Sequence, residues 1–380
     1  VWNSGIVKSD SSQWVALPGT IQLRPGQAYY WKARVTTNRG TTAWSPVATW
    51  STGLLTPDHW AGQWIGIDSL MVWDRVERHS RLSARYLRKT FSARQVPVRR
   101  AMIYISGLGC YTLSVNGRRV GHEVLTPLPT DYTKTVAYDS YDVTTLLDRD
   151  NAIGVTLEGG HYFAQTQNFQ TNVRTTYGQP RLRANLIIEY ADGTADTVVT
   201  DSSWRVWADG PVRYANEYDG ELYDANRRMD GWDRPGYDDA RWMKAQAMAA
   251  PGGVLCGALA PNMSVYQTER PVAVHRYGRR YIVDFGTNNA GRVRLRMGHT
   301  AQGDTVCIRH AELLQAGDST LYVANLRSAE ATARYVSDGR PAEWMPEFTY
   351  YGFRYVEVTG VDQLTPDQIS RELIADQMDD

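Results

Sequence analysis

Residues 101–117, which read AMIYISGLGCYTLSVNG, decide the fold. Around the glycine-rich centre, residues 101–105 and 111–115 have the period-two pattern of strands with one packed and one solvated face. Asn116-Gly117 follows the second run, and Asn-Gly after such a run is the strongest short-range hairpin signal. The stretch therefore predicts paired antiparallel strands with a tight turn at Asn116-Gly117.

The same alternation continues along the rest of the chain, and turn dipeptides such as Asp192-Gly193 and Asp338-Gly339 separate the runs. Many short strands with frequent turns favour β-sandwiches. We therefore predict an all-β protein of successive antiparallel, jelly-roll-like sandwiches. Further alternating runs lie at residues 29–35, 182–190, 293–297 and 353–358.

Helical patterns are scarce in this sequence. Residues 318–333 are compatible with a loop or a short helix. Residues 366–378 predict a final helix, with Thr365 as N-cap and Pro366 at the first helical position.

The composition excludes some classes of function. The 380 residues hold 41 Lys plus Arg and 41 Asp plus Glu, so the net charge is zero and gives no reason to expect a nucleic acid partner. The sequence has no run of about 18 apolar residues, so it predicts no membrane-spanning helix. Cys110, Cys256 and Cys307 form no metal-ligand spacing, and we interpret them as buried or half-buried thiols.

The aromatic residues are mostly those with a polar edge, with 13 Trp and 23 Tyr against 6 Phe. Such rings suit surfaces that handle sugars, but they also suit the half-buried faces of antiparallel sheets. Composition alone slightly favours the sheet explanation.

Breaks in the pattern at residues 53–57 and 250–253 predict domain boundaries. Residues 1–56 hold too few strands for a full sandwich, and we expect them to be the rear part of a domain. We assign two sandwiches, at 57–252 and 262–370, and expect residues 371–380 to begin a linker.

Several motifs now carry a family resemblance. YISGLGCY at residues 104–111 and VNGRRVG at 115–121 resemble the N-terminal β-domain of bacterial α-L-rhamnosidases of glycoside hydrolase family 78. DFGTNNAG at 284–291 and FTYYGFRYV at 348–356 are similar to the second β-sandwich of that family. Residues 1–56 resemble the rear half of its fibronectin-type domain.

The resemblance implies an inverting hydrolase whose two carboxylates lie in a helical barrel that would begin just beyond Asp376. No residue of this chain inherits a catalytic role, so we expect the chain alone to be inactive. It would support the barrel and bind a rhamnose-containing glycan or glycoside, in the periplasm or outside the cell rather than in the cytosol. The alternatives are a stand-alone carbohydrate-binding protein and a structural sandwich without a ligand.

Gly159, Gly160, His161 and Tyr162 form the candidate carbohydrate site. Adjacent glycines let a backbone approach a ligand closely, and an aromatic ring beside them stacks on a sugar. The family commonly carries tryptophan where His161 stands, which weakens this assignment. A structural turn is the favoured alternative.

Asp219, Glu221 and Asp224 are the candidate metal ligands. Clustered carboxylates suit an acid/base pair or calcium, and the first β-domain resembles a rhamnose-binding module that holds its sugar through calcium. Local turn chemistry is the favoured alternative. No cofactor is therefore required, and calcium is an option for sugar binding.

Two expectations concern the second sandwich. His310 and Glu312 alternate on a predicted strand and so share a face. A buried hydrogen-bonded pair is favoured over a catalytic dyad. The side facing the barrel is expected to expose an apolar patch that includes Trp344, Phe348 and Tyr350.

Overall fold

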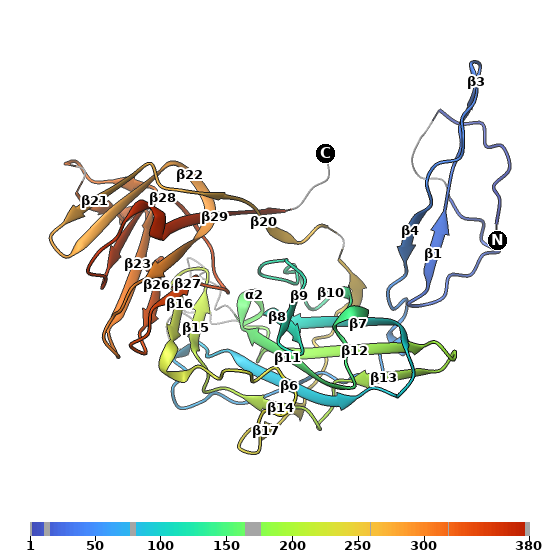
Figure 1. Cartoon of the computed structure of the whole chain (residues 1–380), viewed down its shortest axis with the longest axis horizontal. Helices are drawn as coiled ribbons and strands as arrows, with labels where there is room; N and C mark the ends of the chain where they lie inside the picture. Colours follow the sequence, from blue (N-terminus) through green and yellow to red (C-terminus); the bar gives the residue numbers. More distant parts are fainter. Residues whose placement is uncertain are drawn as a thin grey trace. The chain divides into compact units, whose positions relative to one another are not determined.

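The computed structural model describes residues 2–10, 16–76, 81–163, 176–258, 260–317 and 319–376. It is built almost wholly from strands and short 3-10 turns, which confirms the all-β prediction (Figure 1). The chain divides into two compact units, Val1–His59 and Trp60–Asp380. Within the described ranges, no helix has the length and apolar character that crossing a membrane would require.

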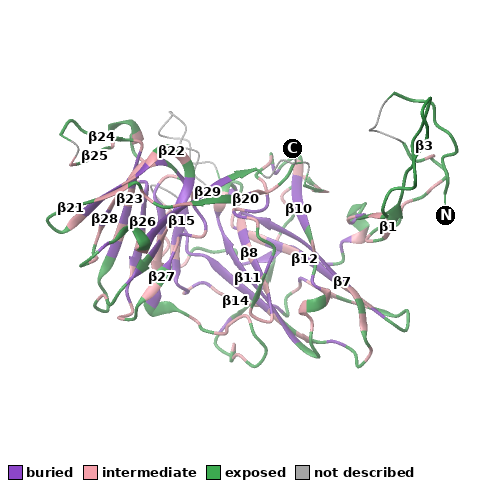
Figure 2. Cartoon of the chain, turned by 45° about the horizontal axis from the view of Figure 1, so that its top comes forward, coloured by how far each residue is buried: buried purple, intermediate pink, exposed green. Residues whose placement is uncertain are grey.

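The first unit contains two small antiparallel sheets. Strand β1 (Ala28–Trp31) pairs with β4 (Ala48–Ser51), and β2 (Thr36–Thr37) pairs with β3 (Gly40–Thr41). The turn η1 (Pro57–His59) ends the unit. Among its described residues only Thr52 and Leu54 are buried, and its strands are drawn largely as exposed in Figure 2.

The second unit starts with a two-layer sandwich. Its larger sheet has the order β18-β5-β12-β7-β10-β19, and β13 pairs with β12. Every pair is antiparallel except β10 with β19, which is parallel. The strands are β5 (Ile65–Gly66), β7 (Val98–Leu108), β10 (Thr135–Asp142), β12 (Arg181–Tyr190), β13 (Ala195–Val199), β18 (Gln246–Ala247) and β19 (Val254–Gly257).

The facing sheet has the order β17-β14-β6-β11-β8-β9. The predicted hairpin is confirmed, because Val115 pairs with Arg118 and both turn residues have positive φ, 55° at Asn116 and 74° at Gly117. The strands are β6 (Arg85–Ser92), β8 (Cys110–Val115), β9 (Arg118–Val120), β11 (Asp150–Glu158), β14 (Arg205–Trp207) and β17 (Met243–Lys244).

The core of this sandwich lies between the two sheets. Ile103 and Leu186 from the larger sheet contact a buried cluster that includes Leu113 and Val155 from the smaller one. Trp204 is buried in the same cluster, and its indole N–H donates to Val199 O over 2.8 Å. Alternation along each strand therefore places one face of each sheet in a shared core.

A second sandwich-like body is built on a ten-stranded sheet, ordered β15-β16-β26-β23-β28-β22-β29-β20, with β21 and β27 also paired to β22. A short hairpin, β24 (Leu313–Leu314) with β25 (Leu321–Tyr322), stands beside it. The strands of the large sheet are β15 (Val212–Asn216), β16 (Gly220–Asp224), β20 (Met263–Glu269), β21 (Ala273–Tyr277), β22 (Arg280–Met297), β23 (Thr305–Ala311), β26 (Thr332–Val336), β27 (Ala342–Trp344), β28 (Tyr351–Thr359) and β29 (Ile369–Asp376).

Strands β15 and β16 come from the segment that we assigned to the first sandwich, yet they belong to the second sheet. β16 pairs in parallel with β26 through Leu222 with Arg334 and Tyr223 with Tyr335. The chain then returns to the first sandwich for β17 and β18. The two bodies are therefore interwoven by the chain itself.

The expected C-terminal helix is wrong. Thr365 and Gln368 do form a capping box with Pro366, but they open only the 3-10 turn η5 (Pro366–Gln368). The chain continues directly into β29, which pairs with β22 on one side and β20 on the other. Sheet pairing on both sides outweighs a local start signal, so residues 371–376 are strand and not the expected linker, while residues 377–380 lie outside the described residues. The remaining short turns and helices are η2 (Thr144–Leu146), α2 (Gly160–Phe163), η3 (Ala225–Arg227) and η4 (Ala324–Leu326).

Two of the three residues named for the exposed apolar patch, Trp344 and Phe348, are buried, so they were wrongly assigned to it. Trp344 is buried in the second core, where its ring meets Tyr223 and Tyr335. Phe348 is buried in a cluster with residues of the first sandwich, and Tyr350 is half-buried. Trp344 and Phe348 face the interior because the second core and the joint between the two bodies, respectively, provide apolar partners for them.

Candidate functional site

The Gly159-Gly160 pair closes the end of β11 against β8. Glu158, buried just before it, accepts hydrogen bonds from the N–H groups of Gly160 at 2.9 Å and Ala215 at 3.4 Å. Gly160 has φ 44°, and a Cβ there would lie 2.7 Å from Cys110 Sγ. Close packing and backbone conformation therefore account for this glycine without a ligand.

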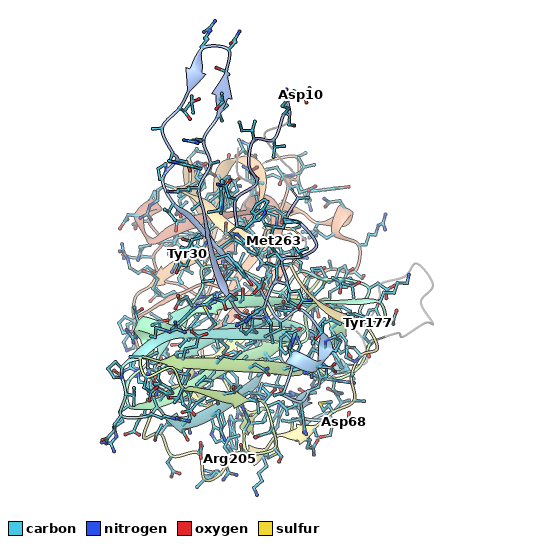
Figure 3. All side chains as sticks on the ribbon, turned by 90° about the vertical axis from the view of Figure 1, so that its right-hand side faces the viewer. Asp10, Tyr30, Asp68, Tyr177, Arg205 and Met263 are labelled. Atoms are coloured by element: carbon cyan, nitrogen blue, oxygen red, sulfur yellow. The ribbon has the colours of Figure 1, made fainter. Side chains whose placement is uncertain are left out.

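The other two residues of the candidate sugar site point in different directions. Tyr162 is buried, and its ring meets Tyr132 at 5.0 Å and Tyr177 at 5.7 Å between centroids. His161 is exposed. Tyr177 is 44 % exposed and lies at the rim of the first sandwich (Figure 3). The surface that a sugar would meet here is therefore His161 and Tyr177, with Tyr162 behind them.

Three residues near this loop, Glu217, Tyr218 and Tyr350, were not predicted from the sequence. The turn between β15 and β16 carries Glu217 and Tyr218, and Tyr350 precedes β28. Burial, and then the charge of Glu217, raises the pKa of both Tyr218 and Tyr350. Glu217 also contributes, after burial and other charges, to a raised pKa of Tyr132. Only the interweaving of β15 and β16 brings these distant segments together, so no local motif signalled them.

The three candidate metal ligands each serve a different protein partner. Asp219 is fully buried, and its Oδ2 accepts from Arg81 Nε at 2.7 Å. Glu221 Oε2 accepts from two backbone N–H groups, those of Glu347 at 2.8 Å and Phe348 at 2.9 Å.

Asp224 is the N-cap of η3, and its side chain accepts from the N–H of Asn226 at 3.0 Å. Within the part of the chain that the structure describes, no three His, Cys, Asp or Glu side chains gather in a way that would hold a metal ion. Asp219, Glu221 and Asp224 therefore do not fit calcium, and ion pairing and local capping account for them.

Glu158 and Glu221 are buried acids whose pKa values lie well above the ordinary value. Burial raises the pKa of each to about 8, and the backbone N–H groups that they accept from only partly offset this. Both carboxyls are therefore largely protonated at neutral pH. Each is only 1 % exposed, so a glycosidic bond has no access to them.

His310 is a buried structural residue. Its Nδ1 lies 2.9 Å from Ala331 O, and its ring stacks on Tyr351 with centroids 3.7 Å apart. Burial lowers the pKa of His310 to about 3, so the ring is neutral at neutral pH. Glu312 instead accepts from Asn288 and Asn325. The expected His310–Glu312 pair is therefore wrong, because β23 ends at Ala311 and the chain turns away.

Polar contacts join the two bodies of the second unit. Val124 N donates to Met263 O at 2.9 Å, and Asn262 Nδ2 donates to Asp139 Oδ1 at 2.7 Å. Arg81 links Asp219 to Glu330 by ion pairs of 2.7 and 2.6 Å. An apolar cluster that contains Tyr86, Trp242 and Phe348 fills the same joint. The joint combines packing with paired charges, as a fixed interface does.

Three family models match the chain. The α-L-rhamnosidase N-terminal domain matches residues 96–267, and the bacterial α-L-rhamnosidase concanavalin-like domain matches residues 275–375. A Rha78A-like N-terminal immunoglobulin domain matches residues 1–56, where we expected a fibronectin-type domain of the same sandwich architecture.

Individual relatives agree with these models. An α-L-rhamnosidase of Alteromonas sp. (strain LOR) is 33 % identical over 372 residues, which is 95 % of this chain and 39 % of the relative. One from Streptomyces avermitilis is 40 % identical over 291 residues, or 73 % of this chain and 27 % of the relative. The solved α-L-rhamnosidase of Dictyoglumus thermophilum superposes with a TM-score of 0.84 at 33 % identity, over 93 % of this chain and 40 % of that one.

The chain thus spans well under half the length of these relatives. The matches cover its β-domains in the order in which the family models describe them. The chain therefore belongs to the bacterial α-L-rhamnosidase family and carries its N-terminal β-domains.

Proposed function

We propose that this chain is the non-catalytic front part of an α-L-rhamnosidase, and that it supports a catalytic domain rather than hydrolysing glycosides itself. The observation that carries the proposal is the course of β15 and β16. They leave the first sandwich, complete the edge of the second sheet and lead back again. Such an exchange makes one firm body from two sandwiches, which suits a supporting role.

The chemistry of the joint supports the same role. Arg334 donates to Tyr214 at 3.0 Å and to Glu330 at 2.7 Å, and Arg81 lies over the ring of Tyr214 with its Cζ 4.9 Å from the centroid. Asp219 completes this network from a fully buried position. Asp219 is buried while Arg81 is partly exposed, so breaking this pair leaves a buried group without its charge partner and favours one arrangement of the joint.

The burial and hydrogen bonding of Glu158, Glu221 and Asp219 are further evidence against hydrolysis by the chain alone. An inverting glycosidase needs two accessible carboxyl groups about 6.5–9.5 Å apart with water between them. Glu158 and Glu221 are buried and bonded to backbone N–H groups. Asp219 is held by Arg81. These acids serve folding rather than proton transfer to a substrate.

A second proposal concerns sugar contact at α2. His161 and Tyr177 form an exposed imidazole and an exposed ring beside the buried Tyr132 and Tyr162. Gly159 and Gly160 hold the loop close to β8, so its backbone is fixed before any ligand arrives. A terminal rhamnose of a glycan or glycoside would stack on Tyr177 and bond to His161.

Two measurements test these proposals. The purified chain is expected to show no turnover of an aryl α-L-rhamnoside, and turnover at the rate of a complete enzyme would contradict the supporting role. Fused to the segment that follows the match in the Alteromonas relative, the chain is expected to give an active chimera. For α2, titration calorimetry with L-rhamnose, with and without calcium, should show weaker binding in Tyr177→Ala than in the parent chain.

A further inference from the structure

An open hollow of about 420 Å³ lies at the end of strands β6 and β11, on the first sandwich and formed by residues other than those of α2. Thr90 and Ser92 of β6 and Asp150 of β11 line one part of it. The loop Pro235–Asp239, which precedes β17, lines another part. Neither the family models nor the function proposed above assigns a role to this hollow.

The loop over the hollow is held firmly in place. Arg88, itself only 1 % exposed, donates from Nε to Trp232 O at 2.8 Å and from Nη2 to Arg234 O at 3.0 Å. Its Nη1 also forms an ion pair with Asp239. A built-in cation thus fixes the loop by three contacts, which reduces the ordering cost of binding a ligand there.

Glycine and aromatic packing complete this support. A Cβ on Gly154 of β11 would lie 2.5 Å from Asp233 Cβ, so only glycine lets the segment lie this close to the sheet. The ring of Trp242 contacts Trp232 at 6.0 Å and Tyr237 at 5.9 Å between centroids. Tyr237, at the hollow, is therefore a positioned ring rather than a freely moving one.

Two of the polar side chains that line the hollow, Asp150 and Asp239, are carboxylates and only accept hydrogen bonds. Asp239 uses Oδ2 for Arg88, while its Oδ1 lies 3.9 Å from Arg205 Nε, too far for a hydrogen bond. Asp150 accepts from Ser92 Oγ at 2.7 Å and is exposed. One cation and two carboxylates among the lining residues give a net formal charge of −1. This composition disfavours anions and suits a neutral ligand that donates several hydrogen bonds.

We propose that this hollow binds a neutral pyranoside, such as one sugar unit of a glycan. Hydroxyl groups of the sugar donate to the carboxylates of Asp150 and Asp239, in the stronger, charge-assisted class of hydrogen bond. The Tyr237 ring covers an apolar face of the sugar. The inference rests on the proposed function only in that the chain belongs to a glycan-handling protein, and the site is separate from α2.

The test titrates the full chain with methyl α-L-rhamnopyranoside and methyl α-D-glucopyranoside in EDTA, followed by NMR chemical shifts or calorimetry. We expect a Kd on the order of 1 mM for at least one of them, equivalent to about 4 kcal/mol. Thr90→Trp, which fills the hollow from an exposed strand position, should weaken binding at least tenfold. Thr197→Trp, an exposed threonine on β13 of the other sheet, is the matched control and should leave binding unchanged.

Asp150→Asn gives a second, milder variant that keeps the size of the side chain, and a severalfold weaker Kd is expected. Equal binding by the Thr90→Trp and Thr197→Trp chains would overturn the inference, as would the absence of binding in EDTA. Loss of binding in Tyr177→Ala alone would place the sugar at α2 and also overturn it. None of these results bears on catalysis, so the inference is able to fail while the supporting role stands.

Discussion

The two units of the chain use the same kinds of aromatic residue in opposite ways. In Val1–His59, Tyr30 is 71 % exposed and Trp31 is 54 % exposed. In the second unit, Trp204 and Tyr104 are each 1 % exposed. The difference teaches that richness in Trp and Tyr does not decide whether a ring is core or surface. Contacts from elsewhere in the chain decide it, because Trp204 lies in the core between the two sheets whereas Tyr104 packs against Tyr138.

The largest expected effect is that of Trp204→Ala in the second unit. The substitution removes a fully buried side chain and its hydrogen bond to Val199 O, so the free energy of unfolding should fall by about 3–5 kcal/mol. Urea denaturation followed by circular dichroism measures it. A loss below about 1 kcal/mol would mean that the two sheets do not share the core described here.

The next effect concerns the joint. Asp219→Ala leaves Arg81 with Glu330 as its remaining ion-pair partner, and Arg81 is partly exposed. We therefore expect a loss of about 2 kcal/mol, below the usual cost of breaking a fully buried pair. Asp367→Ala is the control, because it breaks an ion pair with Arg296 whose two side chains are 70 % and 57 % exposed. The control should change stability by less than about 0.5 kcal/mol.

The pH dependence of stability should also distinguish the units. Glu158 and Glu221 have folded pKa values raised to about 8, so their contribution is complete below about pH 4.5 and is lost as the pH rises toward 8. His310 has a folded pKa lowered to about 3, so its contribution is present above about pH 6.5 and is lost as the pH falls toward 3. Between these two values the two acids lose more stability than the one imidazole gains, so the second unit should be most stable near pH 4.5 and lose stability as the pH rises toward 8.

Thermal melts of the chain across pH 4 to 9 measure this profile. In Glu158→Gln and Glu221→Gln chains, the fall in melting temperature from about pH 5 to 8 should become shallower, because an amide does not ionise. A fall of unchanged steepness in both variants would show that other groups cause it.

The smallest effect is expected in the first unit. Trp31→Ala removes a ring that is already more exposed than buried, so the free energy of unfolding should change by less than about 1 kcal/mol. The comparison with Trp204→Ala is direct, because the residue type and the replacement are the same. Equal losses at the two positions would erase the distinction between the units.

The sequence predicted the local elements well and their partners less well. The Asn116-Gly117 hairpin followed from two residues and one alternating run, because this turn needs only local conformations with positive φ. Thr365 and Pro366 gave an equally clear local signal, yet residues 369–376 form a central strand. A capping sequence stabilises only the first turn of a helix, whereas β22 and β20 pair with residues 369–376 along their length.

The candidate site shows the same limit. Gly160 and His161 lie on one loop as the sequence indicates, but Tyr162 faces inward because Tyr132 and Tyr177 surround it. The hollow at Thr90 and Tyr237 had no sequence signal at all, since its walls come from three segments, at residues 88–92, 150–151 and 235–239, that are far apart in the sequence.

The sequence by itself determined the all-β class, the turns and the family, because alternation, turn chemistry and motif order are properties of neighbouring residues. Only the tertiary structure decided which rings are buried, that β15 and β16 complete the second sheet, and that Asp219 and Glu221 belong to the joint. Burial and charge pairing depend on residues that lie far away in the sequence, and no single stretch of sequence shows which of these residues will make contact.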